Sequence, residues 1–267
     1  MASDRATALS ATRAAPGAVR VPEVTAYFWT IKALSTAMGE ASSDFLVKTL
    51  HPVPAVGLGF VGFCVALVVQ FSRRRYVAWS YWLAVAGVGV FGTMAADVLH
   101  VGFHVPYVAS SVLYAVILGA VFVAWYRTEA TLSIHTIDTV RREAFYWAAV
   151  VATFAMGTAV GDLTASTLHL GYGLSILLFA GIMLVPASGY RWFGLHPVPA
   201  FWFAYVVTRP LGASFADWVG KPTALSGLGW GDGRIALFLV VVIIALVGYL
   251  SVTHRDVQQR FGPAPPA

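Results

Sequence analysis

The stretch WTIKALSTAMGEASSD at residues 29–44 begins with a tryptophan, has a glycine ten residues later and ends in an aspartate after five more. The same spacing, W-x9-G-x4-D, recurs at residues 82–97, 147–162 and 202–217. Composition alone rarely produces four such copies, because the chain has only 9 Trp among 267 residues. The spacing therefore indicates four internal repeats, which decide the architecture.

The composition around these repeats is that of a membrane protein. Apolar residues make up 58% of the chain and charged residues 11%, whereas soluble domains have about 45–50% and roughly 25%. A single cysteine, Cys64, excludes an internal disulfide. The formal net charge of +5 is typical of positive loops on one side of a membrane, so we expect no nucleic-acid partner.

Apolar segments of about 20 residues, the length that spans a bilayer, can be counted along the chain. They lie at residues 25–47, 54–71, 76–99, 105–126, 144–163, 170–185, 199–219 and 234–252. The sequence thus predicts an all-α polytopic membrane protein with eight transmembrane helices in residues 24–252. Each repeat is expected to be one helical hairpin, and because each has two spans, the repeats are parallel and pseudo-symmetric: 24–75, 76–127, 143–191 and 197–252.

Basic residues predict the orientation, since cytoplasmic loops collect Lys and Arg. One side of the eight-helix arrangement holds Arg5, Arg13, Arg20, Arg73, Arg74, Arg75, Arg127, Arg141, Arg142, Arg191, Arg255 and Arg260. The other side holds only Lys48, Lys221 and Arg234. We therefore expect a bacterial inner-membrane protein with a disordered cytoplasmic tail at residues 1–23 and a second cytoplasmic tail at residues 253–267.

With these four Trp-Gly-Asp sets and the Lys32, Gly39-Glu40 and Asp44 pattern of the first copy, the chain resembles a family of bacterial membrane proteins of unknown function. That family is built from four tandem repeats, each with two transmembrane segments and a characteristic tryptophan. The resemblance covers roughly residues 24–252 and implies the fold and the membrane location. It implies no reaction.

A polar stripe follows one face of each motif helix, because positions 3, 7, 11 and 15 after the Trp differ by four. Its polar members are Lys32, Thr36, Glu40 and Asp44 in the first copy, Thr93 and Asp97 in the second, Thr158 and Asp162 in the third, and Arg209 and Asp217 in the fourth. Charged side chains within a membrane are costly and usually face the protein interior along an ion or proton path. We expect these residues to converge on a pseudo-symmetry axis.

The four aspartates Asp44, Asp97, Asp162 and Asp217 are candidate ligands of a divalent cation, with Glu40, Thr93 and Thr158 nearby. Oxygen-rich sites suit Mg²⁺, Ca²⁺ or Mn²⁺. Each aspartate could instead cap a helix end near the surface. No resident cofactor is expected beyond such a bound cation.

The remaining motif residues have two interpretations each. Lys32 and Arg209 are candidate charge partners of the acids, although Lys32 could instead snorkel to the cytoplasmic surface. The repeated Trp residues are expected to be interfacial anchors. The repeated Gly residues are expected to allow close helix packing, with a hinge or a backbone ligand as the alternative. His51, His100, His104 and His169 could collect a metal or relay protons, or be surface-loop residues.

The leading functional prediction is a secondary transporter of a cation, with proton-coupled export of a divalent metal such as Mn²⁺ as its most concrete form. Its partners would be the lipid bilayer, the cation and protons. A non-transporting structural or regulatory membrane protein is the alternative. A membrane-embedded enzyme is disfavoured because no G-x-S-x-G or H-E-x-x-H motif occurs. A retinal protein is disfavoured because no lysine lies in a late helix.

Overall fold

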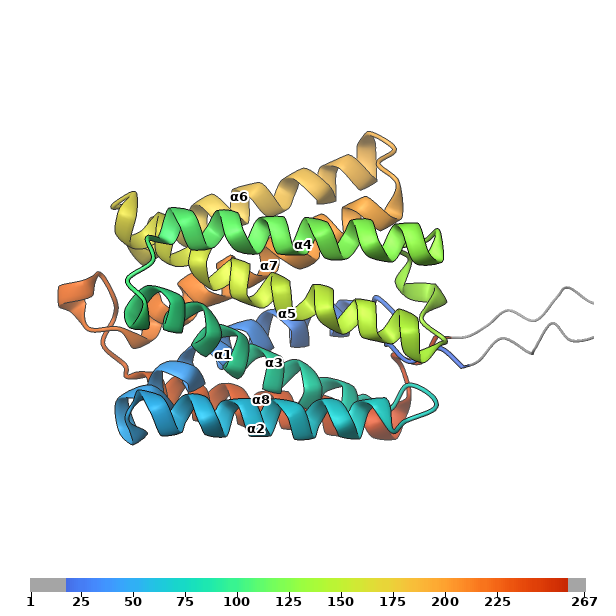
Figure 1. The fold of residues 1–267 in the computed structure, drawn as a ribbon, viewed down its shortest axis with the longest axis horizontal. Helices are drawn as coiled ribbons and strands as arrows, with labels where there is room; N and C mark the ends of the chain where they lie inside the picture. Colours follow the sequence, from blue (N-terminus) through green and yellow to red (C-terminus); the bar gives the residue numbers. More distant parts are fainter. Residues whose placement is uncertain (1–17, 259–267) are drawn as a thin grey trace, which may run out of the picture.

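The computed structural model describes residues 18–258, and this part of the chain is helical with no β-strand. Its eight long helices are α1 (Ala26–Leu50), α2 (Pro52–Phe71), α3 (Ala78–Asp97), α4 (Tyr107–Glu129), α5 (Val140–Asp162), α6 (Gly171–Trp192), α7 (Pro197–Gly220) and α8 (Asp232–Thr253). Short π-helices, η1 (Val98–Gly102) and η3 (Leu163–Thr167), extend α3 and α5. All eight helices run side by side along the long dimension of the molecule (Figure 1).

Six of the helices described in residues 18–258 are long and apolar enough to cross a membrane. They are α2, α3 with η1, α4, α5 with η3, α6 and α8. This number is typical of a multi-pass membrane protein. The two others, α1 and α7, carry Lys32, Glu40 and Arg209 and lie among the apolar helices.

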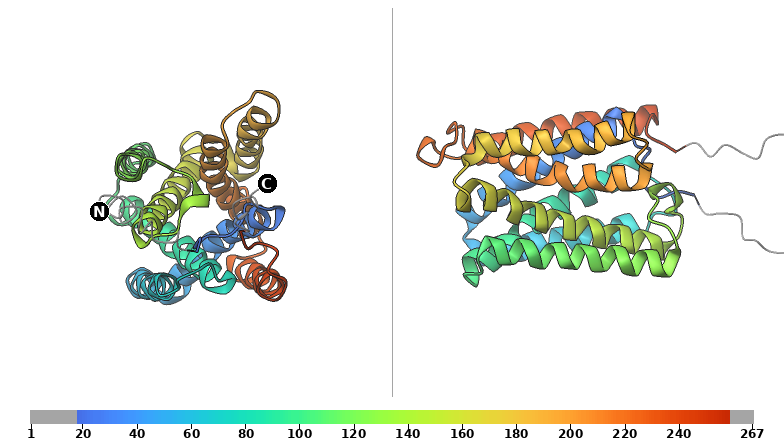
Figure 2. Two further views of the ribbon diagram at one scale, coloured as in Figure 1. Left: turned by 90° about the vertical axis from the view of Figure 1, so that its right-hand side faces the viewer. Right: turned by 90° about the horizontal axis from the view of Figure 1, so that it is seen from above.

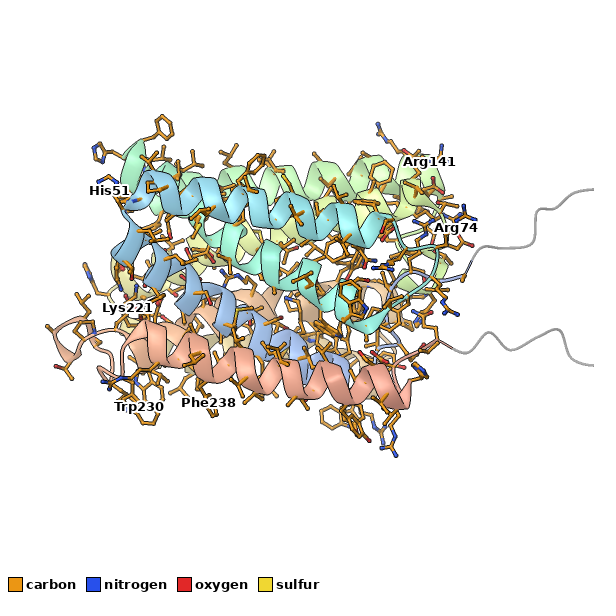
Figure 3. All side chains as sticks on the ribbon, turned by 90° about the horizontal axis from the view of Figure 1, so that it is seen from below. His51, Arg74, Arg141, Lys221, Trp230 and Phe238 are labelled. Carbon is orange, nitrogen blue, oxygen red and sulfur yellow. The ribbon has the colours of Figure 1, made fainter. Side chains whose placement is uncertain are left out.

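The helices form two concentric layers. The odd-numbered helices form an inner ring in which α1 contacts α3, α3 contacts α5, α5 contacts α7 and α7 contacts α1. The even-numbered helices lie outside this ring, as the end-on view in Figure 2 shows. Their outward side chains are apolar and exposed, among them Leu58, Val68, Leu177 and Phe238, which is labelled in Figure 3. Such a surface suits lipid rather than water.

Each outer helix packs mainly on the inner helix of the next repeat. Thus α2 lies against α3, α4 against α5, and α6 against α7, while α8 returns to α1 and closes the circle. The hairpin expected within each repeat is therefore not its main packing unit.

The four repeated glycines are the points of closest approach between inner helices. A Cβ on Gly39 would lie 2.6 Å from the backbone carbon of Gly89, and one on Gly92 would lie 2.9 Å from the Cβ of Phe154. A Cβ on Gly157 would overlap Arg209, and one on Gly212 would overlap Thr36. Each glycine thus faces position 7 of the next repeat, and the fourth faces the first. The prediction of close packing at these glycines is confirmed.

Gly39→Ala is expected to lower the free energy of unfolding by about 1–3 kcal/mol, the usual cost of overpacking. The added Cβ would meet backbone atoms of α3, and these cannot rotate away as a side chain can. Thermal unfolding in detergent measures the effect. Gly119→Ala is the matched control, because a Cβ there would meet nothing within 4 Å on the exposed face of α4. Equal melting temperatures for the two variants would contradict the tight contact.

Both described ends of the chain lie at one end of the bundle. Figure 3 places Arg74 and Arg141 at this end, which is called the arginine-rich end below, and His51 and Lys221 at the other. Residues 18–23 were expected to be part of a disordered tail, but they pack: Val21 is buried, and Arg20 forms a 2.7 Å ion pair with buried Glu143. The tails predicted at residues 1–17 and 259–267 lie outside the described residues.

Candidate functional site

Eight aromatic side chains close the inner ring at its arginine-rich end. The aromatic residue before each repeated Trp contacts the Trp of the next repeat. The ring centroids are 5.8 Å apart for Phe28 and Trp82, 5.5 Å for Tyr81 and Trp147, 6.0 Å for Tyr146 and Trp202, and 5.8 Å for Phe201 and Trp29. The cycle runs through all four repeats and returns to the first. We call these eight residues the aromatic layer.

The repeated tryptophans are therefore not interfacial anchors, and that prediction was wrong. Trp82, Trp147 and Trp202 are buried, and Trp29 is partly buried. Trp202 donates its indole N–H to the carbonyl of Leu132 at 2.9 Å. The expectation failed because a Trp at a helix start suits a lipid interface and a helix–helix contact equally well, and only the neighbouring repeat decides between them.

A buried ion pair lies in the middle of the inner ring. Arg209 of α7 donates to Glu40 of α1 at 2.8 Å, and neither side chain is more than 5% exposed. The same guanidinium donates to Thr93 of α3, to Thr158 of α5 at 2.7 Å and to the carbonyl of Thr36 at 3.3 Å. The predicted convergence of Glu40, Thr93, Thr158 and Arg209 is thus present, with one residue from each inner helix.

Lys32 has neither of its predicted roles. Its side chain is fully buried and does not reach the surface, and its ammonium nitrogen has no hydrogen-bond partner among the described residues. The nitrogen lies 4.4 Å from the ring centroid of Phe154 and 4.3 Å from that of Tyr205. Snorkelling fails because the aromatic layer covers Lys32 at the arginine-rich end. Pairing with the acids fails because Arg209 is already bound to Glu40.

Asp44 and Asp217 both lie next to the side-chain ammonium of Lys221, at the end of the inner ring opposite the aromatic layer. Lys221, directly after α7, pairs with Asp44 and lies 3.5 Å from Asp217. Burial lowers the pKa of Lys221, but the neighbouring carboxylates of Asp217 and Asp44 outweigh it and raise that pKa above its ordinary value. Lys48 also pairs with Asp44, at 3.3 Å, but its side chain is 55% exposed.

Asp97 and Asp162 occupy the same level of the ring without an ion pair among the described residues. Both are half-buried, and each is followed directly by a π-helix, η1 after Asp97 and η3 after Asp162. Such π-helical turns occur often at functional sites. Two carboxylates without a counter-ion remain capable of binding a cation or a proton.

The four aspartates do not form a compact ligand set in this structure. In residues 18–258, no three His, Cys, Asp or Glu side chains lie close enough together to hold a metal ion. The histidines do not extend the set: His51, His104 and His169 are exposed turn residues with positive φ, and His100 stacks on Tyr107. A cation bound by all four aspartates would require Lys221 to leave.

Lys221 is the site residue that the sequence interpretation missed, because it was assigned to a loop. A signal was available, since Lys221 follows Asp217 by four residues, the spacing of a helical ion pair. Its second partner, Asp44, is 177 residues away and could not be found by spacing.

Comparisons with known proteins identify the repeats but no activity. A family model described as Repeat of Unknown Function (DUF347) matches residues 27–76, 80–131, 145–194 and 200–256. These boundaries follow the four copies of the W-x9-G-x4-D spacing. No curated protein and no solved structure matches the chain.

Proposed function

The chain belongs to the DUF347 family of repeats of unknown function, and we propose that it is an eight-span secondary transporter that exchanges a cation for protons. Helices α1 and α7, with 25 and 24 residues, are long enough to cross a bilayer beside the six apolar spans. Their charged side chains face the inner ring rather than lipid, which supports eight spans. The arginine-rich end is assigned to the cytoplasm of a bacterial inner membrane by the positive-inside rule.

The main support for transport is the ammonium of Lys221 between Asp44 and Asp217. Carboxylates from the first and fourth repeats already hold one positive charge there. Asp97 and Asp162 provide two further acids at the same level of the ring. A cation from solution can take the place of the ammonium once the loop of Lys221 moves. A divalent metal such as Mn²⁺ is the first substrate to test, because it prefers carboxylate oxygens.

The aromatic layer and the Glu40–Arg209 pair lie on the proposed cation path, between the four aspartates and the arginine-rich end. Transport requires that a site open to one side of the membrane be closed to the other, and the packed aromatic rings and the buried ion pair support closure toward the arginine-rich end. We infer that the pair must separate in the opposite conformation. Both ions are costly to bury alone, so an incoming cation or proton would have to compensate the separated charges.

The decisive experiment is flux in proteoliposomes. Wild-type protein is expected to move Mn²⁺ against its gradient when an opposing pH gradient is imposed, and to stop when an ionophore collapses that gradient. Mg²⁺, Ca²⁺, K⁺ and organic cations are compared in the same assay, with empty liposomes as the control. Absence of flux for every cation would overturn the transporter proposal.

Lys221→Met is expected to increase the affinity for the transported cation by about tenfold, equivalent to ~1.4 kcal/mol. The reason is that the ammonium no longer competes for Asp44 and Asp217. Equilibrium binding to purified protein measures the effect. Lys48→Met is the matched control, because Lys48 contacts the same aspartate from an exposed position. Unchanged affinity in Lys221→Met would place the cation site elsewhere.

A structural or regulatory role is the second candidate, and the Glu40–Arg209 pair favours it. Buried ion pairs can fix the register of packed helices without binding any ligand. Under this alternative, the purified protein would bind no cation, and replacing Asp44 or Lys221 would change only its stability.

A further inference from the structure

Among the described residues, Lys32 is a fully buried basic side chain without an ion pair or a hydrogen-bond partner. Its nitrogen contacts the faces of two aromatic rings with no carboxylate or other acceptor in hydrogen-bond reach. The equivalent positions in the other repeats are Val85, Val150 and Tyr205. Repeat symmetry therefore does not account for an amine at this place.

The surroundings of Lys32 suit both of its protonation states. The ring faces of Phe154 and Tyr205 attract an ammonium ion. The guanidinium carbon of Arg209 lies 5.0 Å from the centroid of the same Phe154 ring, and its charge repels a second positive charge nearby. A neutral amine is only weakly polar, so its desolvation between the apolar ring faces of Phe154 and Tyr205 costs little.

Few titratable groups face Lys32 from the helices packed around it. Helix α7 brings Arg209 and Tyr205, and α1 itself brings Glu40 two turns away. Helices α3 and α5 bring the phenols of Tyr81 and Tyr146. Helix α2 has no charged residue, and α8 has charges only in its first turn.

Tyrosine hydroxyl groups lie within the aromatic layer and beside it. Within the aromatic layer, the hydroxyls of Tyr81 and Tyr146 are hydrogen-bonded to each other. The hydroxyl of Tyr205 is buried without a hydrogen-bond partner in the described part of the chain. Tyr76, whose ring centroid lies 5.8 Å from that of Tyr81, donates its hydroxyl to Asp256 near the C-terminal end. These hydroxyls are polar groups among the otherwise apolar side chains at this end of the inner ring.

We propose that Lys32 is the proton-binding site of the transport cycle, and that the tyrosine hydroxyls of the aromatic layer carry its released proton to the arginine-rich end. This inference rests on the proposed function. In the release step, an N–H bond of the ammonium breaks, the electron pair stays on the nitrogen, and the proton passes to the hydroxyl path. In the opposite conformation, Lys32 binds the next proton from the end of the ring that carries the four aspartates, so one proton crosses the membrane in each cycle.

The position of Lys32 also provides the coupling to the cation. Eight residues of helix separate Lys32 from Glu40, which corresponds to about 12 Å. At an effective dielectric constant of about 20, a unit charge at that distance changes the proton affinity of the amine about tenfold. A cation that reaches the acids therefore favours proton release from Lys32, and its departure favours proton uptake.

The first test observes the amine directly and does not depend on transport. The chain has three lysines, Lys32, Lys48 and Lys221, so nitrogen-15 spectra of the side-chain amines can be assigned with single Lys→Met variants. As the pH rises, the Lys32 signal is expected to change from that of an ammonium ion to that of a neutral amine while the protein stays folded. A Lys32 signal that stays in one state over the whole pH range in which the protein is folded would overturn the proposal.

The second test uses flux. Lys32→Met, which keeps the length of the side chain and its contacts with Phe154 and Tyr205, is expected to conduct the cation downhill but to lose at least tenfold of its proton counterflow. Lys32→Arg, permanently charged, is expected to lose the counterflow as well. Proton-driven accumulation by a folded Lys32→Met protein would overturn the proposal while the transporter function stands. Wild-type protein without any cation flux would instead overturn the transporter function, and the amine titration would still decide the protonation of Lys32.

Discussion

Arg209→Met is expected to lower the free energy of unfolding by about 3–5 kcal/mol, because it leaves the carboxylate of Glu40 buried without its counter-ion. The substitution also removes the donors that bind Thr93, Thr158 and the carbonyl of Thr36. Glu40 is only 5% exposed, so water cannot replace the guanidinium without opening the inner ring. Denaturant or thermal unfolding in a mild detergent measures the loss.

The double variant Glu40→Met/Arg209→Met separates the pair from its surroundings. Removing both charges leaves no unpaired ion, so the double variant is expected to recover most of the stability lost in Arg209→Met. Arg142→Met is the control, since Arg142 pairs with Glu129 and Asp138 at the arginine-rich end and its side chain is 25% exposed. Additive losses in the double variant would contradict a direct Glu40–Arg209 interaction.

Asp44→Asn is expected to reduce proton-driven cation flux by about 100-fold, equivalent to ~2.7 kcal/mol, the size of one lost charge-assisted contact. Asp44 is the acid that binds the ammonium of Lys221 across the ring, and asparagine has a similar shape without the charge. Asp162→Asn is expected to have a comparable effect, because it removes one of the two carboxylates without an ion pair in the described structure. Flux is measured in proteoliposomes and normalised to the amount of folded protein.

Asp138→Asn provides the matched control for these aspartates. Asp138 is a carboxylate of the same type that pairs with Arg142 outside the inner ring, and its replacement is expected to leave flux close to that of the wild type. Undiminished flux in both Asp44→Asn and Asp162→Asn would remove these carboxylates from the path. Unchanged flux together with lower stability would favour the structural role.

The sequence predicted that Glu40, Thr93, Thr158 and Arg209 converge, because repeat spacing and helical periodicity together determine which face of each helix they occupy. Glu40, Thr93 and Thr158 occupy the same position in three repeats, so any ring of parallel helices brings them together. The contacts of the repeated glycines follow for the same reason. Hydrophobic length predicted all eight helices to within a few residues at most ends.

Features that depend on which helix is the neighbour could not be predicted. The burial of Trp82, Trp147 and Trp202 follows from the cyclic contacts between repeats, which a single repeat does not contain. The position of Lys221 depends on the conformation of the turn after α7. Lys32 has no acidic partner because Glu40 pairs with Arg209 instead. The metal site of four aspartates was predicted without the competing ammonium of Lys221.

The circular order of contacts also constrains how the molecule is made. Glu40 is synthesised 169 residues before Arg209, and at about 5–20 residues per second that interval lasts on the order of 10–30 s. During this time the first helix has an acid without its counter-ion, and its face for α7 and α8 is empty. The nascent protein must therefore wait beside the insertion machinery or in contact with water until its last repeat arrives.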